Sequence, residues 1–136
     1  MRTTTILEKG LASAINAGVV LLMSLPIGFL YSWDVWRVSA IVLFFLYNLF
    51  FLGLKDERSL GMMVTHSYWK DPVRFPQHFL HSILYTVSFS TLLIWIYFPF
   101  DLFLVNMLLL QLPTILKTGT TLHARLSGNL ATVVRE

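Results

Sequence analysis

Hydrophobic residues run in long unbroken stretches along this chain instead of alternating with polar ones. Four intervals contain no Asp, Glu, Lys or Arg, namely 10–33, 38–54, 77–100 and 102–116. A helix needs about 20 apolar residues to cross the hydrocarbon core of a bilayer, with a range of about 17–25. The pattern therefore predicts an all-α, polytopic membrane protein, one domain over 1–136, whose four-transmembrane-helix bundle has spans near 11–31, 37–54, 81–99 and 101–117.

The third and fourth intervals are better explained by two spans than by one. A single helix from Ser82 to Leu116 would measure roughly 52 Å at about 1.5 Å per residue, and the hydrocarbon core is only roughly 30 Å thick. Pro99 and Asp101 supply a helix break and a polar turn between the two intervals. We therefore expect two antiparallel helices that are joined by a tight turn there.

Composition and charge placement agree with this arrangement. Hydrophobic residues make up 56% of the chain and charged residues 12%, about half the charged fraction of an average soluble domain. This composition argues against a soluble enzyme, a disordered segment and a nucleic-acid-binding module. With four spans, Arg37 alone lies on one side, and the other side carries Arg2, Lys9, Lys55, Arg58, Lys70, Arg74, Lys117, Arg125 and Arg135. The positive-inside rule then places both termini in the cytoplasm, and we expect the bacterial inner membrane as the location.

The central loop and the tail are predicted to lie at the membrane surface. Residues 55–81 mix aromatic with basic side chains, as amphipathic interfacial segments do. Either a surface connector or a docking or lipid-headgroup site fits them. Leucines at 122, 126 and 130 give the tail one apolar helical stripe, and valines at 133–134 suggest a short extended finish. The residues expected to contact headgroups are Trp69, Lys70, Arg74, His78 and His81.

Four polar residues share one depth in the predicted spans. Asn16, Asn48, Ser88 and Gln111 each lie six positions from the inner end of a span, roughly 9 Å below the boundary at about 1.5 Å per residue. An unpaired amide in hydrocarbon is costly, so we expect an intramembrane polar layer that joins the helices. This layer is either packing glue between helices or part of a narrow ion or solute path. On the first span, Ala14 and Gly18 form a small-residue pair that suits close helix packing.

Candidate chemistry is sparse. The chain has no cysteine, and it shows no Ser-His-Asp order, phosphate-binding glycine loop or paired buried carboxylates, so we expect no enzyme activity. His78 and His81 are i, i+3 neighbours and His66 lies nearby, which leaves a metal or haem site open. Surface histidines that face headgroups are the preferred interpretation, and we expect no cofactor and no metal.

Two segments resemble a known family. Residues 122–128, Leu-His-Ala-Arg-Leu-Ser-Gly, followed by the valines at 133–134, are similar to the closing motif of RDD-family membrane proteins. Residues 58–62, Arg-Ser-Leu-Gly-Met, resemble the family's element after its second span, and Lys9 and Asn16 match its opening pattern. The arginine and the two aspartates that name the family are replaced here by Lys9, Asn16 and Ala124. The signature positions are Lys9, Asn16, Leu122, His123, Ala124, Arg125 and Gly128. The resemblance implies the family's fold and, because some members are supposed to act in transport, a possible role in transport.

Two functions follow from these patterns as expectations. The first is a non-enzymatic accessory or scaffold subunit that packs within a larger membrane complex. The second is a homo-oligomeric channel or transporter-like protein that moves ions or small solutes, as the resemblance implies. The expected partners are the lipid bilayer and other membrane subunits or copies of the chain itself.

Overall fold

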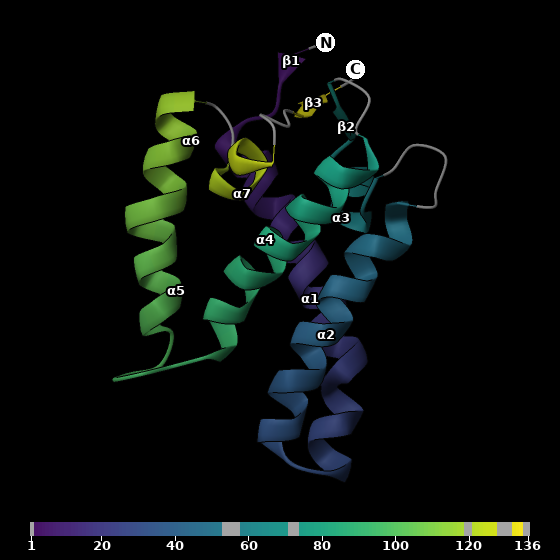
Figure 1. Ribbon diagram of the computed structural model, residues 1–136, viewed down its shortest axis with the longest axis vertical. Helices are drawn as coiled ribbons and strands as arrows, with labels where there is room; N and C mark the ends of the chain where they lie inside the picture. Colours follow the sequence, from purple (N-terminus) through teal and green to yellow (C-terminus); the bar gives the residue numbers. More distant parts are fainter. Residues whose placement is uncertain (1, 53–57, 71–73, 119–120, 128–131, 135–136) are drawn as a thin grey trace.

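The computed structural model describes residues 2–52, 58–70, 74–118, 121–127 and 132–134, and most of these residues are helical (Figure 1). Helices α1 (Ile6–Leu30) and α2 (Trp33–Leu52) form an antiparallel hairpin. Both helices are long and apolar enough to cross a membrane. We call the end at their turn the hairpin end, and the end that carries both termini the terminal end.

Local signals in the sequence explain the boundaries of this hairpin. At the start of α1, Thr5 and Glu8 form a capping box: the Thr5 side chain accepts from the Glu8 amide at 3.2 Å, and Glu8 accepts from the Thr5 amide at 2.9 Å. At the turn, Trp36 Nε1 donates to Ser24 Oγ at 2.9 Å. A Cβ atom on Gly28 would collide with the Trp33 ring, so this glycine lets the two helices turn closely.

Helix α4 (Phe75–Leu93) packs against the hairpin and completes the apolar core. The rings of Phe44 in α2 and Phe89 in α4 stack with their centroids 4.1 Å apart. Around them, the core of buried side chains consists of Val20, Ala40, Phe44, Phe89 and Leu93. This core therefore joins α1, α2 and α4.

A fourth helical segment, which we call the arm, runs beside α4. It consists of α5 (Asp101–Val105), the π-helical turn η1 (Asn106–Gln111) and α6 (Leu112–Thr118). The helical break lies where the Pro99–Asp101 sequence predicts it. The Asp101 carboxylate there accepts the backbone N–H groups of Ile96, Tyr97 and Leu102. In Figure 1 the arm stands apart from the α1–α2 hairpin, with α4 between them.

The loop and the tail fold over the terminal end. A three-stranded antiparallel sheet joins β1 (Arg2–Thr3), β3 (Thr132–Val134) and β2 (Ser67–Trp69), with β3 in the middle. The short helices α3 (Leu60–Val64) and α7 (Leu122–Leu126) lie at the same end. The extended finish predicted at 133–134 is confirmed as part of β3. The sheet itself was not predicted, because its strands are too short to leave a pattern.

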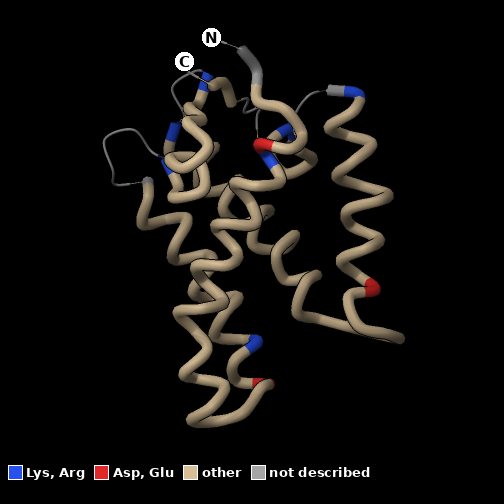
Figure 2. The backbone as a smooth tube through the Cα atoms, turned by 180° about the vertical axis from the view of Figure 1, so that it is seen from behind, with Lys and Arg blue, Asp and Glu red and all other residues tan. Residues whose placement is uncertain are grey.

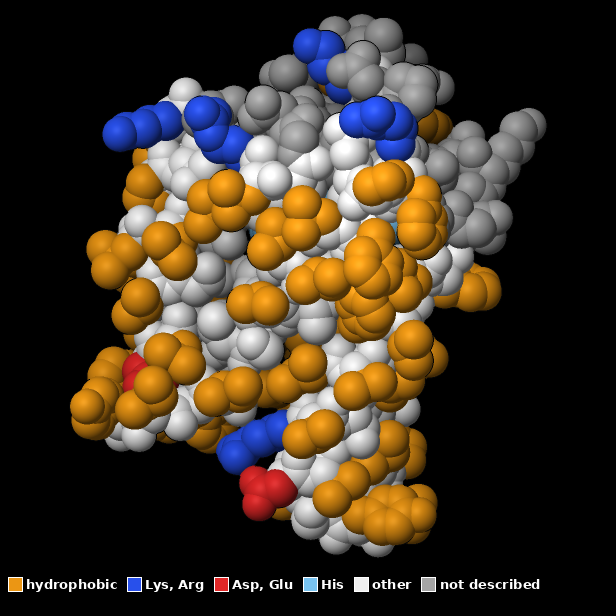
Figure 3. Space-filling model, viewed as in Figure 1, with side chains coloured by type: hydrophobic (Ala, Val, Ile, Leu, Met, Phe, Trp, Pro, Cys, Tyr) orange, Lys and Arg blue, Asp and Glu red, His pale blue; other side chains and the backbone are white. Residues whose placement is uncertain are grey.

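Polarity is distributed unlike that of a soluble domain. Among the described residues, polar side chains outnumber hydrophobic ones in the buried set, and many large hydrophobic side chains are exposed. Figure 3 shows hydrophobic side chains spread over the flank of the molecule. Figure 2 shows that Lys and Arg residues gather at the terminal end. Such a surface suits a molecule whose flank contacts apolar material.

Candidate functional site

A partly enclosed polar chamber lies at the terminal end, beneath the sheet. Its volume is about 90 Å³, which is enough for several water molecules. It is lined by residues from the helices α1, α2, α3, α4 and α7 and from the strands β2 and β3. Its polar lining is Thr4, Lys9, Ser13, Asn16, Asn48, Ser59, Ser67, His78, His81, Tyr85, Thr121, His123 and Thr132.

Asn16 is the hub of the hydrogen bonds in this chamber. Its Oδ1 atom accepts from the Tyr47 hydroxyl at 2.7 Å and from the Gly61 backbone N–H at 2.9 Å. Its Nδ2 atom donates to Ser59 Oγ at 3.1 Å. The Tyr85 hydroxyl donates to Ser13 Oγ on the same face of α1 at 3.0 Å. This one amide therefore ties α1 to α2 and to the loop that carries α3.

A cluster of aromatic and imidazole rings forms another wall. The Tyr85 ring stacks on His123 with centroids 4.6 Å apart, and His81 lies 5.0 Å from His123. Trp69 meets His81 edge-on at 5.5 Å. Burial lowers the pKa of His123 to about 4, because a charged imidazolium loses its hydration there. His123 is therefore a neutral ring at physiological pH.

Two imidazole nitrogens in this chamber lack a hydrogen-bond partner among the described residues. They are His78 Nδ1 and His123 Nδ1, and both rings are buried. The other ring nitrogens are occupied: His78 Nε2 contacts the Asn48 carbonyl oxygen at 3.1 Å, and His123 Nε2 contacts Thr121 Oγ1 at 3.1 Å. Buried polar atoms normally have partners, so these two nitrogens leave hydrogen-bonding capacity unused beside the chamber.

Lys9 sits at the sheet side of the chamber. Its ammonium group donates to the hydroxyl of Thr4 and, at 3.3 Å, to that of Thr132. These two threonines also contact each other. The first turn of α1 and the last strand of the chain thus hold this cation together.

A close backbone contact fixes α3 against α1. A Cβ atom on Gly61 would collide with the backbone of Ala12. Because the approach is so close, the Gly61 amide reaches the Asn16 side chain. Ala14 is exposed and a Cβ atom on Gly18 would meet nothing within 4 Å. Among the described residues, the close backbone approach to α1 therefore lies between Ala12 and Gly61, and packing at Ala14 and Gly18 stays a prediction.

The predicted polar layer divides into two separate groups. Asn16 and Asn48 line the chamber, and Asn48 Nδ2 donates to the Phe44 carbonyl of its own helix at 2.8 Å. Ser88 and Gln111 meet between α4 and the arm instead, together with Asn106. Asn106 Nδ2 donates to Ser88 Oγ at 2.8 Å, and Gln111 Nε2 contacts the same oxygen at 3.4 Å.

Four of the positions that were matched to the RDD-family signature meet at the chamber. Lys9, Asn16, His123 and Ala124 all line it, although they come from opposite ends of the chain. The other positions differ in their surroundings. The Leu122 amide donates to Gln111 Oε1 at 3.0 Å, Arg125 is exposed, and Gly128 lies outside the described residues.

The residues that were expected to contact headgroups also separate. Lys70 and Arg74 are exposed. His78 and His81 are buried, and Trp69 lines the chamber half-buried. They differ from the expectation because the loop and the tail fold over them and enclose their polar edges.

Sequence reasoning missed several residues of the site. Tyr47 and Tyr85 were not singled out, although a tyrosine in the middle of an apolar stretch, away from its ends, signals a buried hydroxyl that needs a partner. Asn106 carries the same signal as the other amides. Arg58 is buried, bonded to the Ser67 carbonyl at 2.9 Å, and its Cζ atom lies 3.7 Å from the centre of the Tyr68 ring.

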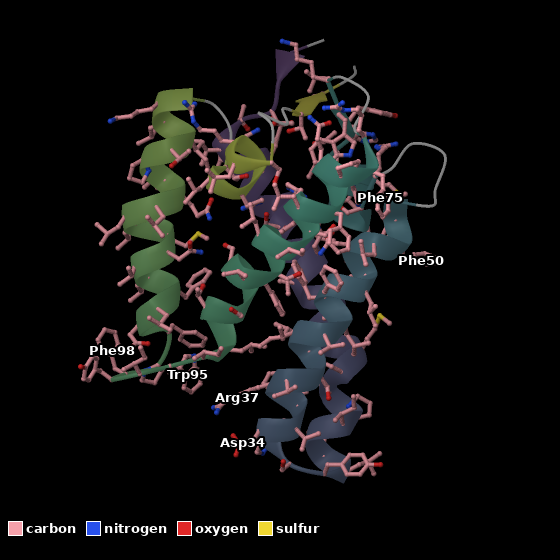
Figure 4. The ribbon with its side chains drawn as sticks, in the orientation of Figure 1. Asp34, Arg37, Phe50, Phe75, Trp95 and Phe98 are labelled. Atoms are coloured by element: carbon pink, nitrogen blue, oxygen red, sulfur yellow. The ribbon has the colours of Figure 1, made fainter. Side chains whose placement is uncertain are left out.

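An apolar groove lies at the hairpin end, and Figure 4 shows its charged edge. Arg37 of α2 reaches towards Trp95, and its Cζ atom lies 5.0 Å from the ring centre. The groove has a volume of about 550 Å³, and its lining includes leucines of α1 and α4. Asp34 lies 3.4 Å from the Arg37 guanidinium and is almost fully exposed.

Neither ligand geometry nor similarity assigns a chemistry directly. In the part of the chain that the structure describes, no group of three or more His, Cys, Asp or Glu side chains is placed to hold a metal ion. When it is compared with protein families, curated proteins and solved structures, the chain matches none of them. The chamber is therefore interpreted from its own side chains.

Proposed function

We propose that this chain is a helical integral membrane protein that crosses the bilayer four times, through α1, α2, α4 and the arm. The observation that carries the proposal is the polarity of the arm, whose buried residues are Asp101, Asn106 and Gln111. Its exposed large hydrophobic residues are Leu104, Val105, Leu108, Leu109, Leu110, Leu112 and Leu116. A helix in water buries its apolar face, so this inverted arrangement favours lipid or another apolar helix as the surroundings.

The charges support an orientation for this membrane protein. Basic residues gather at the terminal end (Figure 2), whereas Arg37 lies at the hairpin end (Figure 4). The positive-inside rule then favours both termini in the cytoplasm. We propose the bacterial inner membrane as the location, with the chamber at the cytoplasmic end of the bundle.

Within the membrane, the proposed role is that of a non-enzymatic accessory or scaffold subunit. Among the described elements, the arm packs mainly against α4, and its exposed hydrophobic side chains stay uncovered by them. A lone apolar helix that is held on one side by a few polar contacts offers a continuous surface to a neighbouring subunit.

Site-specific photocrosslinking in native membranes tests this role. A photoreactive amino acid at Leu109 on the arm is expected to crosslink to one defined protein in near-stoichiometric yield. Leu22 on α1 is the matched control, since it is about as exposed as Leu109, at 69% against 67%. If Leu109 and Leu22 give only the same diffuse lipid adducts, the accessory role is wrong.

The chamber favours a second function, a homo-oligomeric channel or transporter-like protein. Its buried histidines and Lys9 are polar groups of the kind that mark solute pathways in membranes. Crosslinks from Leu109 to other copies of the chain, and closed rings in native mass spectrometry after gentle detergent extraction, would favour this function over the first. The meeting of Lys9, Asn16 and Ala124 around one chamber supports the further proposal of a distant relationship to RDD-family proteins.

A further inference from the structure

The groove at the hairpin end has two chemically different parts, and Figure 3 shows the hollow between the hairpin and the side of the molecule that carries the arm. Its inner part is lined by Leu21 of α1 and by Leu92 and Leu93 of α4. The rings at its mouth are those of Trp33, Trp36, Trp95 and Phe100. The volume of about 550 Å³ is within the range of about 300–1,000 Å³ that is typical of pockets for organic ligands. The groove therefore suits an apolar chain that enters between aromatic rings.

Arg37 brings a positive charge to the mouth of this groove, and it is the single charged residue of the described lining. Its Cζ atom lies 5.0 Å from the centre of the Trp95 ring, so a cation–π contact holds the guanidinium there. Among the described residues, its one hydrogen-bond partner is Asp34, whose Oδ1 atom lies 3.4 Å from Nη1. The remaining N–H groups of the guanidinium have the planar arrangement that binds phosphate oxygens in pairs.

Asp34 places a negative charge beyond this positive one. It lies one turn nearer the hairpin turn on the same face of α2, and 92% of its side chain is exposed. Figure 4 shows Trp95, Arg37 and Asp34 following one another in this order towards the end of the hairpin. Asp101 does not compete for a cation at the mouth, because it is buried and its carboxylate accepts backbone N–H groups of its own turn. The mouth therefore carries a dipole whose positive end faces the groove.

We propose that this groove binds one phospholipid with a phosphoethanolamine headgroup, whose phosphate contacts Arg37 and whose ammonium group contacts Asp34. One acyl chain lies in the groove. In this lipid the acyl chain, the phosphate and the ammonium group follow one another in the order of the groove, Arg37 and Asp34. A phosphoglycerol headgroup has no cation for Asp34, and a phosphocholine headgroup has no N–H group to donate. This inference rests on the proposed membrane location, because its ligand is a component of the bilayer.

Native mass spectrometry of the full-length chain in detergent tests the proposal. Whether the chain needs detergent to stay in solution is measured first, because this tests the membrane location separately. Phosphatidylethanolamine, phosphatidylcholine and phosphatidylglycerol with identical acyl chains are then added in equal amounts. The chain is expected to retain one phospholipid and to prefer phosphatidylethanolamine roughly three- to tenfold, as one additional net hydrogen bond implies. Excess glycerophosphoethanolamine, which has the headgroup but no acyl chains, does not displace it.

Matched variants separate the contributions of the two charges and of the groove. Arg37→Gln lowers retention of all three phospholipids roughly threefold or more, because each of them carries a phosphate. Asp34→Asn removes the preference for phosphatidylethanolamine, because a neutral amide no longer attracts the ammonium group. Arg125→Gln, at an exposed arginine of the terminal end, changes neither property. Leu21→Trp fills the groove and lowers retention, whereas Leu22→Trp, at the exposed neighbouring position, does not.

Three outcomes would overturn the proposal. They are equal retention of the three phospholipids by the parent chain, an unchanged preference in Asp34→Asn, and displacement by glycerophosphoethanolamine. If a variant does not fold, as judged by thermal melting, the order of the three phospholipids on the parent chain decides alone. A chain that needs detergent but retains phospholipids without selectivity contradicts this inference only. A chain that stays in solution without detergent contradicts the proposed membrane location, and this inference with it.

Discussion

At the scale of single residues, Asn16 shows how much structure one amide can organise. It accepts from Tyr47 and from the Gly61 backbone, and it donates to Ser59. Its depth in the first apolar stretch predicts that it needs partners. Its partners were not predictable, because the sequence does not show which tyrosine hydroxyl faces Asn16, and another partner is a backbone amide in the loop after α2.

Gly61→Ala is expected to destabilise the protein. The added methyl group would collide with the Ala12 backbone, and the shift that relieves this collision also lengthens the hydrogen bond to Asn16. Overpacking of this kind costs about 1–3 kcal/mol, which thermal unfolding in detergent would detect as a lower midpoint. Gly10→Ala is the control because a Cβ atom there meets nothing within 4 Å. Equal midpoints for the two variants would contradict the close approach.

Stability is expected to fall on acidification because of His123. Burial lowers its folded-state pKa to about 4, from 6.5 in the unfolded chain. Below pH 6.5 the unfolded chain therefore binds a proton that the folded chain does not, and the free energy of unfolding falls until about pH 4. The full effect is on the order of 3 kcal/mol.

Equilibrium unfolding between pH 7.5 and 4 would measure this dependence. His123→Phe keeps a flat ring against Tyr85 and is expected to flatten the curve, whereas the exposed His66→Asn is not. If the free energy of unfolding falls with pH equally in the parent chain and in His123→Phe, His123 does not cause the pH dependence.

At the scale of elements, the arm joins α4 through polar side chains that apolar residues surround. Ser88 and Gln111 were predictable as residues at one depth, and the break at Pro99 and Asp101 placed the arm antiparallel to α4. The η1 turn was not predictable, because a π-helical turn depends on contacts across the helix pair and leaves no local composition. Asn48 has the same depth as Ser88 but binds its own helix, since the Phe44 carbonyl one turn earlier in α2 lies within its reach.

Gln111→Leu is expected to loosen α7 from the arm. Gln111 Oε1 accepts the Leu122 amide, which lies in the first turn of α7. Loss of one hydrogen bond of about 1 kcal/mol should speed local opening roughly fivefold. Hydrogen–deuterium exchange of residues 121–127 measures this, with Leu110→Ala on an exposed face of the same turn as the control. Unchanged exchange in Gln111→Leu would rule out this link.

At the scale of the whole molecule, the hydrophobic pattern predicted the helices and the charges predicted a difference between the two ends. Neither of them predicted the chamber, because the chamber depends on how residues 58–70 and the tail fold back over the bundle. Lys9, His78 and His123 each read as surface residues when considered alone. Their burial follows from contacts between segments far apart in the chain, such as Thr4 with Thr132, and no local pattern encodes those contacts.

Single-cysteine labelling is expected to place the two ends of the molecule on opposite sides of a membrane. The chain contains no cysteine, so Ser32→Cys at the hairpin end and Lys70→Cys at the terminal end give clean labels at exposed positions. An impermeant maleimide added to intact cells should react with Cys at position 32 only. Reaction of both from outside, or of neither before lysis but both after it, would contradict four crossings in the proposed orientation.

The three-stranded sheet has a consequence for biosynthesis. Its middle strand, β3, follows β1 and β2 in the chain, and both of these strands pair with it. The sheet over the polar chamber can therefore form only after β3 has been synthesised. A chain that stops before Thr132 would retain its long helices but would lack the sheet. Lys9 would then lose its contact with Thr132 and be accessible to cellular quality control.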